Sequence, residues 1–278
     1  MLDAPINPNK ALWEKGDFTR IAETMRQSGE EFVASLDIKP GLRVLDLGCG
    51  DGTTALPAAQ RGAEVLGVDI ASNLVAAGNE RARAAGLDNL RFVEGDASDL
   101  SDIGDSRFDL VISMFGAMFA PRPLDVASEM VRVTRPGGRI VMGNWIPADP
   151  TLVAQILNIC TAYTPAPPPG FISPMHWGDT PEVRERFEGA GIPPEDIGIE
   201  RATWVFRQEG PPTDLFETFR RYYGPTMNAF EAAARSGREE ELADELRSLF
   251  VKQNRGCETT AIPANYLKVT VNVGRKLS

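Results

Sequence analysis

The sequence is poor in the residues on which several kinds of active site depend. It contains one histidine, His176, and three cysteines, Cys49, Cys160 and Cys257, without paired spacing. A single histidine excludes a three-histidine zinc site, and a Ser-His-Asp mechanism could use only that side chain. The cysteine pattern disfavours a disulfide framework and a cysteine-based metal site. It fits a reducing compartment, so we expect a cytoplasmic protein.

Long apolar segments and excess positive charge are also missing. The longest nearly uncharged run covers residues 110–121, well short of the roughly 20 residues that a membrane helix needs. The first residues include neither a basic region nor an apolar signal core. With 29 basic and 39 acidic residues, the net charge is -10, which disfavours nucleic acid or anionic lipid as a partner. We expect no membrane span, no nucleic-acid partner, and a monomer or homodimer.

Strands and helices alternate in the first half of the sequence. Short β-branched or leucine-rich runs predict strands at residues 43–48, 64–70, 90–94, 108–115 and 139–145. Helical patterns between them cover residues 53–61, 72–85 and 124–134. Such alternation with short turns predicts an α/β fold with a parallel sheet covered on both faces.

The remaining segments are less regular. Residues 1–40 have apolar side chains at helical spacing and predict an N-terminal helical arm. Residues 41–147 form the expected core domain, and residues 148–263 form a helical lid segment that includes a sixth strand near 197–207. Alternation with period two predicts a last strand at 266–273, within a final unit of residues 264–278.

A glycine-rich loop is the most informative local feature. The segment from Val44 to Gly52 reads as a strand that ends near Asp46, followed by three alternating glycines and a helix. Glycine lets a ligand approach the backbone closely, and the carboxyl end of a strand is where open α/β sheets bind ligands. Alone, the pattern would fit a tight strand-to-helix turn equally well.

Two further acids make a ligand site the better interpretation. Asp69 ends the second predicted strand, where a carboxylate can accept from both hydroxyls of a ribose. Asp96 ends the third, where its oxygen could accept from an adenine amino group. A nicotinamide site is the competing interpretation. It prefers Gly-x-Gly-x-x-Gly spacing, and Asp51 would repel its pyrophosphate.

The segment from Val44 to Trp145 resembles a class I S-adenosylmethionine-dependent methyltransferase. The resemblance rests on the glycine loop, the acid after the second strand, Gly95-Asp-Ala97, Phe108-Asp-Leu-Val111 and Arg135-Pro-Gly-Gly138. It implies a Rossmann-like, doubly wound seven-stranded sheet with an antiparallel last strand, and S-adenosylmethionine as cofactor. Residues 13–18, 118–121 and 176–179 resemble bacterial small-molecule methyltransferases related to the ubiquinone/menaquinone-biosynthesis type.

The resemblance also implies roles for individual residues. Asp46 should lie near the ammonium group, Asp69 should hold the ribose hydroxyls, and Asp96 should read the adenine edge. The full set of expected cofactor-binding residues is Trp13, Asp46, Gly48, Cys49, Gly50, Asp69, Ile70, Asp96, Ala97, Ser113 and Met114. Magnesium-dependent relatives carry an acid after the fourth strand, where this sequence has Ser113, so we expect no metal.

An aromatic and apolar set remains for the acceptor. The expected substrate-binding residues are Phe115, Met118, Trp145, Trp177, Tyr222 and Tyr223. Their side chains would line a mostly apolar pocket. His176 is the candidate general base because its ordinary pKa suits the task, with acids and tyrosines of the lid as alternatives. We place His176 and Trp177 in a cover over the methyl group.

These observations predict a methyltransferase that transfers a methyl group to a small, largely apolar acceptor at oxygen, nitrogen or carbon. Two alternatives stay open. One is a quinone-type C-methyltransferase, although the length of the segment after residue 151 argues against a quinone. The other is a non-catalytic S-adenosylmethionine-binding protein.

Overall fold

A computed structural model describes residues 7 and 9–274, and a seven-stranded sheet forms its centre. The strand order is β3-β2-β1-β4-β5-β7-β6, and β7 is antiparallel to both of its neighbours. The strands are β1 (Arg43–Leu47), β2 (Glu64–Asp69), β3 (Leu90–Glu94), β4 (Phe108–Met114), β5 (Thr134–Trp145), β6 (Ile197–Gln208) and β7 (Thr260–Asn272). The predicted doubly wound sheet with an antiparallel last strand is confirmed.

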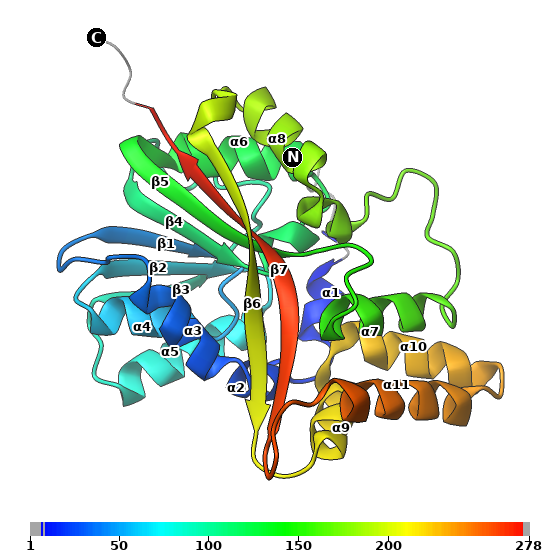
Figure 1. The fold of residues 1–278 in the computed structure, drawn as a ribbon. Helices are drawn as coiled ribbons and strands as arrows, with labels where there is room; N and C mark the ends of the chain where they lie inside the picture. The colour runs from blue at the N-terminus through cyan, green and yellow to red at the C-terminus, as the bar shows by residue number, and fades with distance from the viewer. Residues whose placement is uncertain (1–6, 8, 275–278) are drawn as a thin grey trace.

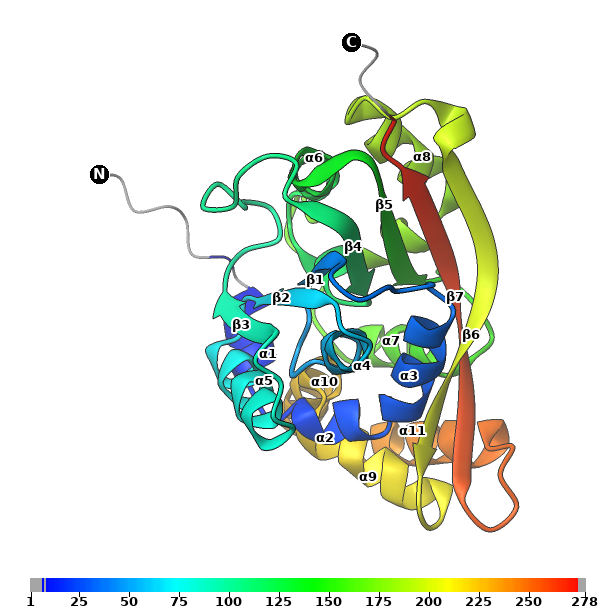
Figure 2. The same ribbon diagram turned by 90° about the vertical axis from the view of Figure 1, so that its left-hand side faces the viewer.

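Helices cover both faces of this sheet (Figure 2). One face carries α3 (Arg26–Ala34), α4 (Ala55–Gln60) and α5 (Ser72–Ala84), and the other carries α6 (Pro123–Val133) and α8 (Thr180–Gly189). The central strands β1 and β4 are apolar and almost fully buried between these layers. Burial on both faces explains why their sequences are continuous apolar runs rather than alternating patterns.

A third group of helices packs beside the long β6–β7 ribbon (Figure 1). It consists of α7 (Leu152–Thr161), α9 (Pro212–Tyr222), α10 (Gly224–Arg235) and α11 (Glu239–Gln253), which contact one another. The sequence pattern did not predict α10, because Gly224-Pro225 resembles a helix stop. Proline is tolerated here because it lies in the first turn, where its missing N–H needs no partner.

The N-terminal arm is three short helices rather than one. They are α1 (Asn9–Glu14), α2 (Thr19–Glu23) and α3, and Gly16 separates the first two with a φ of +88°. This left-handed conformation favours glycine and ends the helix. Residues 275–278 of the predicted final unit lie outside the described residues, and β7 begins at Thr260, earlier than predicted.

The predicted lid segment divides between two places. Its helices α7, α9, α10 and α11 form the third group, whereas η2 (Pro174–Gly178) and α8 pack against β5 and α6. The short 3₁₀ turns η1 (Ala117–Phe119) and η3 (Pro194–Asp196) complete the connections. No helix in the described part of the chain has the length and apolar character needed to cross a membrane.

Candidate active site

A cavity opens at the carboxyl ends of β1, β2 and β4, and the arm forms part of its wall. Nine of the residues predicted to bind the cofactor line it, together with one predicted for the acceptor. They are Trp13, Gly48, Cys49, Gly50, Asp69, Ile70, Asp96, Ala97, Met114 and Phe115. The cavity, counted to its open mouth, has about 910 Å³ of space not filled by atoms.

The glycine loop presents bare backbone to this cavity. Gly48 and Gly50 have φ values of +66° and +55°, which only glycine adopts without strain. A Cβ atom on Gly50 would meet no atom within 4 Å. Gly48 also crosses Gly116, where an added Cβ would lie 2.2 Å from the Gly48 carbonyl oxygen. Glycine is therefore required at 116 by this close backbone crossing.

Asp69 ties the glycine loop to the end of β2. Its carboxylate accepts the N–H of Gly50 at 2.7 Å and the N–H of Ala71 at 2.9 Å. Burial raises the pKa of Asp69, although these two backbone donors oppose the shift. The carboxylate lines the cavity, and each oxygen keeps a second lone pair for a ligand.

Asp96 is held from two sides. One oxygen accepts from the Asn7 side-chain amide at 2.9 Å, and the other accepts the Ser98 N–H at 2.8 Å. Asn7 belongs to the arm, and the sequence analysis did not single it out. The arm therefore reaches the end of β3 and closes this side of the cavity.

Asp46 lies behind the cavity wall rather than in it. It is 1% exposed, and the hydroxyl of Thr54, a wall residue, donates to one of its oxygens at 2.5 Å. The other oxygen has no hydrogen-bond partner within the described part of the chain. Burial raises the pKa of Asp46 to about 7. Its expected position near a cofactor ammonium group stays a prediction.

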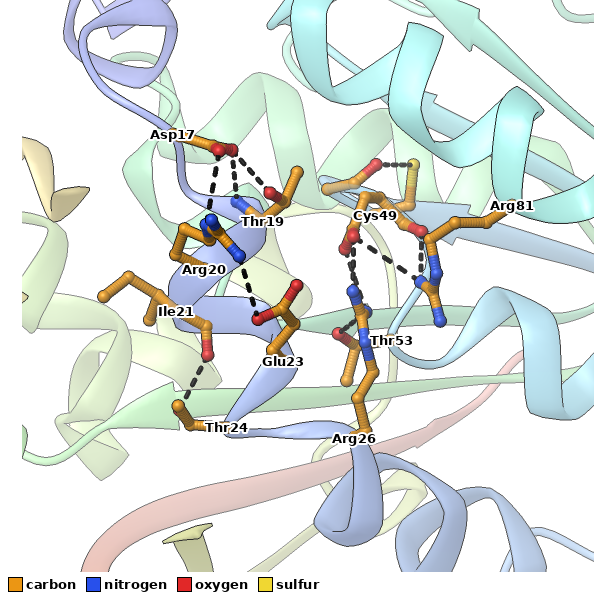
Figure 3. Close-up of polar contacts among 12 residues, drawn as sticks. Asp17, Thr19, Arg20, Ile21, Glu23, Thr24, Arg26, Cys49, Thr53 and Arg81 are labelled. Atoms are coloured by element: carbon orange, nitrogen blue, oxygen red, sulfur yellow. Dashed lines mark hydrogen bonds and ion pairs between the residues drawn. The ribbon is translucent and has the colours of Figure 1, made fainter. Parts of the chain in front are cut away.

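The sequence analysis expected Asp51 to repel a pyrophosphate, but its charge is paired in the structure. Arg26 donates to both of its oxygens, one of them at 2.9 Å, and an Arg81 nitrogen lies 3.6 Å away (Figure 3). The buried carboxylate is thus paired with two guanidinium groups and would not repel a pyrophosphate strongly. These partners lie 25 residues before and 30 residues after Asp51, so no local pattern could reveal them.

Ser113 does not line the cavity, contrary to the prediction. Its side chain is buried, and its oxygen accepts the N–H of Ala117 at 3.1 Å, which fixes the turn after β4. Side chains alternate along a strand, and the neighbouring Met114 faces the cavity instead.

A smaller cavity, here called the inner chamber, adjoins the first. Five wall residues are common to both: Trp13, Phe18, Met25, Phe115 and Phe119. The others are Ile21, Trp145, Val153, Phe206, Phe219 and Tyr223. The chamber therefore lies next to the large cavity along these side chains and has mostly aromatic walls.

Phe115 adopts an unusual backbone conformation to form the shared wall. Its φ is +62°, a region that bulky side chains rarely occupy and that costs about 1–3 kcal/mol. Its ring stacks on Trp145 with centroids 3.6 Å apart and an interplanar angle of 6°. Strain of this kind concentrates at functional sites, and here it places an aromatic ring between the two cavities.

Among the described residues that line the chamber, only Tyr223 carries a hydroxyl group. Its ring packs against Phe219, Trp13 and Phe18, with centroids 5.3 to 6.4 Å apart. The side chain is buried, and its hydroxyl makes no hydrogen bond to any described residue. Burial, with a contribution from Cys160, raises the pKa of Tyr223 above its ordinary value.

Two residues predicted to cover the methyl group lie elsewhere. The His176 side chain is 52% exposed and 4.0 Å from a Glu182 oxygen, and it lines neither cavity. Trp177 is 1% exposed and packs against Phe187 and under the guanidinium of Arg186. The segment docks on the α6 face of the sheet, so the model of a lid carried by Trp177 is wrong.

Two further residues that were predicted to bind the acceptor line neither cavity. Met118 is almost fully buried in the core, and Tyr222 lines a polar surface groove with Arg20 and Arg207. Tyr222 and Tyr223 are adjacent at the end of α9 and lie in different environments. Four residues that line the cavities were not among the predicted site residues: Phe18, Met25, Phe119 and Val153. The helical spacing of Phe18 and Met25 in the sequence could have indicated the first two.

The fold and the cavity define a class I S-adenosylmethionine-dependent methyltransferase, and the chain belongs to that family. Residues 45–142 match the family model described as a methyltransferase domain. The YcgJ protein of Bacillus subtilis has the same fold, with a TM-score of 0.57 and 19% identity, covering 90% of this chain and 99% of that chain. The predicted cofactor, S-adenosylmethionine, is thereby confirmed over the nicotinamide alternative that the glycine spacing disfavoured.

Two proteins are similar to this chain in sequence. It is similar to an uncharacterized protein of Mycobacterium tuberculosis, with 34% identity over 234 residues, which are 84% of this chain and 83% of that protein. It is also similar to the demethylmenaquinone methyltransferase of Bacillus cytotoxicus, with 37% identity over 115 residues. That alignment covers 40% of this chain and 48% of the relative.

The residues present fit the cofactor. Among the described residues, the cavity wall includes Asp51, Asp69 and Asp96 but no lysine, arginine or histidine. Behind the wall, Asp46 keeps one buried oxygen without a partner. Bare glycine backbone, acids and an apolar surface suit a nucleoside that carries a sulfonium and an ammonium group.

Proposed function

We propose that the enzyme methylates a small, largely apolar molecule that binds in the inner chamber. The observation that supports this proposal is the shared wall of Phe115, Phe119 and Trp13 between the chamber and the cofactor cavity. Because these side chains border both cavities, a molecule in the chamber would lie beside the cofactor, and transfer requires the two ligands to meet between these side chains. The attacked atom is an oxygen, a nitrogen or a carbon of that molecule.

The proposed cofactor contacts follow from the wall. Asp69 would accept from the ribose hydroxyls with its free lone pairs, and Ile70 would pack on the adenine. Asp96 and Ala97 would read the adenine edge, with Asn7 fixing the Asp96 carboxylate. The backbone of Gly48 and Gly50 would surround the methionine part. Bound S-adenosylmethionine supplies a methyl group on a sulfonium, which is a good leaving group.

The protein's own contribution is alignment and exclusion of water. The arm places Trp13, Phe18 and Met25 over the junction of the two cavities. The opposite walls come from β5, β6, α7 and the α9–α10 junction. Fixing both reactants in a dry chamber replaces a bimolecular encounter with an oriented one, which accounts for much of the acceleration in such transfers.

A quinone-type acceptor has weaker support. The 115 residues aligned with the demethylmenaquinone methyltransferase are too few to extend from Trp13 to Tyr223, the two ends of the chamber wall in the sequence. Identity in that segment therefore does not carry the acceptor specificity to this chain. The chamber walls are almost entirely apolar and aromatic side chains, which suit a small ring system.

Val153 offers a direct test because it lines the chamber and not the cofactor cavity. Transfer from S-adenosylmethionine should be assayed with a panel of uncharged phenols, amines and quinols of increasing size. Val153→Phe should lower turnover of accepted members by at least about tenfold while cofactor affinity changes less than about twofold, because it fills only the chamber.

Val153→Ala is the matched control in the opposite direction and should extend turnover toward larger acceptors. The proposal fails if only strongly charged acceptors are methylated, or if neither substitution changes turnover or size preference. Calorimetry with S-adenosylhomocysteine on each variant separates a lost chamber from a lost cofactor site.

A further inference from the structure

The described residues that line the inner chamber include hydrogen-bond donors but no base. Apart from the weakly accepting sulfur of Met25, its wall side chains can hydrogen-bond only through the indole N–H groups of Trp13 and Trp145 and the hydroxyl of Tyr223. None is a carboxylate, an amine, a guanidinium or an imidazole. The one histidine of the chain, His176, lines neither cavity.

The acids of the neighbouring cofactor cavity are already engaged. Asp51 is paired with Arg26 and Arg81, Asp69 accepts two backbone N–H groups, and Asp96 accepts from Asn7 and Ser98. None of the three lines the inner chamber. A group that could remove a proton from a bound acceptor is therefore missing from the described walls.

Tyr223 is suited to donate a hydrogen bond rather than to act as a base. Burial keeps its hydroxyl neutral at physiological pH, because the ionised phenolate would lose its hydration. The ionisable group that acts on it is the thiol of Cys160, and burial raises the pKa of that thiol to about 12. Both groups therefore stay uncharged, and the Tyr223 hydroxyl is free of other partners among the described residues.

We propose that the acceptor is a small phenol that reacts as its phenolate, and that Tyr223 positions it by donating a hydrogen bond to the phenolate oxygen. This inference rests on the proposed function and specifies its substrate class. The aromatic walls fit a flat ring, since offset or edge-on contacts between rings are favourable. The Tyr223 donor then sets which atom of the ring system faces the methyl group.

The transfer balances without a base in the chamber. The phenol gives its proton to solvent before it is enclosed. Its oxygen attacks the methyl carbon, an oxygen–carbon bond forms, and the carbon–sulfur bond breaks with its electron pair left on sulfur. The negative charge on the phenolate oxygen and the positive charge on the sulfonium are both neutralised. The attraction between these two charges is strongest in a chamber of low dielectric constant, which also offers no water to solvate the phenolate.

The probe for the test is 4-nitrophenol, whose absorbance reports its ionisation. It should bind to the protein saturated with S-adenosylhomocysteine, and its apparent pKa in the complex should be measured for wild type, Tyr223→Phe and Tyr222→Phe. Loss of one hydrogen bond to the anion should raise the apparent pKa of the bound probe by about one unit in Tyr223→Phe. Tyr222→Phe is the matched control, because Tyr222 lies outside both cavities.

A second measurement follows the pH dependence of turnover in wild type and in Tyr223→Phe. The pH midpoint of kcat/KM should be determined for a series of substituted phenols. If the enzyme has no base, the midpoint should move with the ionisation of each phenol, and Tyr223→Phe should lower kcat/KM about tenfold. A midpoint that stays fixed across the series would reveal an enzymic base and overturn the inference.

Three results separate this inference from the proposed function. Equal probe pKa values in the two tyrosine variants would overturn the role of Tyr223. Tight binding of S-adenosylhomocysteine without binding of 4-nitrophenol, together with a Val153-sensitive turnover of amines, would overturn the phenol and leave the chamber proposal standing. Turnover insensitive to both Val153 and Tyr223 would remove both.

Discussion

Asp46 shows how one buried carboxylate can couple stability to pH. Its pKa of about 7 arises from burial, and a hydrogen bond from Thr54 only partly offsets the loss of hydration. The folded protein therefore keeps this proton in a range where the unfolded chain, with an ordinary pKa near 3.8, has released it. Stability from this group is complete below about pH 4 and is lost as the pH rises to about 7.

Asp46→Asn should remove this dependence. Between pH 4 and 7, wild type without cofactor should lose stability relative to the variant, with a slope of up to about 1.4 kcal/mol per pH unit. Urea unfolding of both proteins at several pH values measures the difference, and other carboxylates cancel in the comparison. A difference that does not change with pH would show that Asp46 ionises normally in the folded protein.

The contact between the arm and the glycine loop depends on α3. Arg26, the first residue of α3, binds the Asp51 carboxylate and donates to the Thr53 hydroxyl at 2.8 Å. Arg81 of α5 supports the same loop with a hydrogen bond to the Asp51 carbonyl at 2.5 Å. Two elements thus hold the loop in the conformation that faces the cavity (Figure 3).

Arg26→Ala should weaken cofactor binding and the fold together. It leaves a buried carboxylate with one partner, so we expect a loss of about 2 kcal/mol in unfolding free energy and at least about tenfold in cofactor affinity. Arg20→Ala is the control, because Arg20 forms exposed pairs with Asp17 and Glu23 at 3.9 and 3.7 Å, which contribute about 0–1 kcal/mol. Equal effects of the two substitutions on cofactor affinity would contradict the role of Arg26.

At the scale of the whole molecule, the proposed cofactor cavity is surrounded by parts of the chain that are distant in sequence. The arm supplies Asn7 and Trp13, and the core supplies the glycine loop and the strand-end acids. Trp204 of β6 completes the wall. A ligand in the cavity contacts all of these parts at once, so binding should stabilise their mutual arrangement.

Saturating S-adenosylhomocysteine should therefore protect the arm. At a hundredfold excess over Kd, unfolding should require about 2.7 kcal/mol more. Hydrogen exchange should slow most in α1 and α2, whereas α8 on the other face of the sheet serves as the internal control. Protection that is equal in α1 and α8 would indicate global stabilisation without closure of the arm.

The core sheet and many residues of the large cavity could be predicted from local sequence patterns. Gly48, Gly50, Asp69 and Asp96 follow directly from the ends of apolar strands. Parallel strands bring their carboxyl ends to one edge, so a local pattern is enough to place these residues together. The last strand was also predictable from its alternating side chains at 266–273. Its antiparallel direction was implied by the resemblance to the methyltransferase family.

Which aromatic residues line the inner chamber could not be predicted from the sequence. Tyr222 and Tyr223 are neighbours of the same type, yet only Tyr223 lines the chamber. Trp177 lies in the segment expected as a lid but is buried on the other face of the sheet. The direction in which a helix docks depends on apolar packing between segments far apart in sequence, and that packing leaves no local pattern to identify which aromatic side chain faces the cavity.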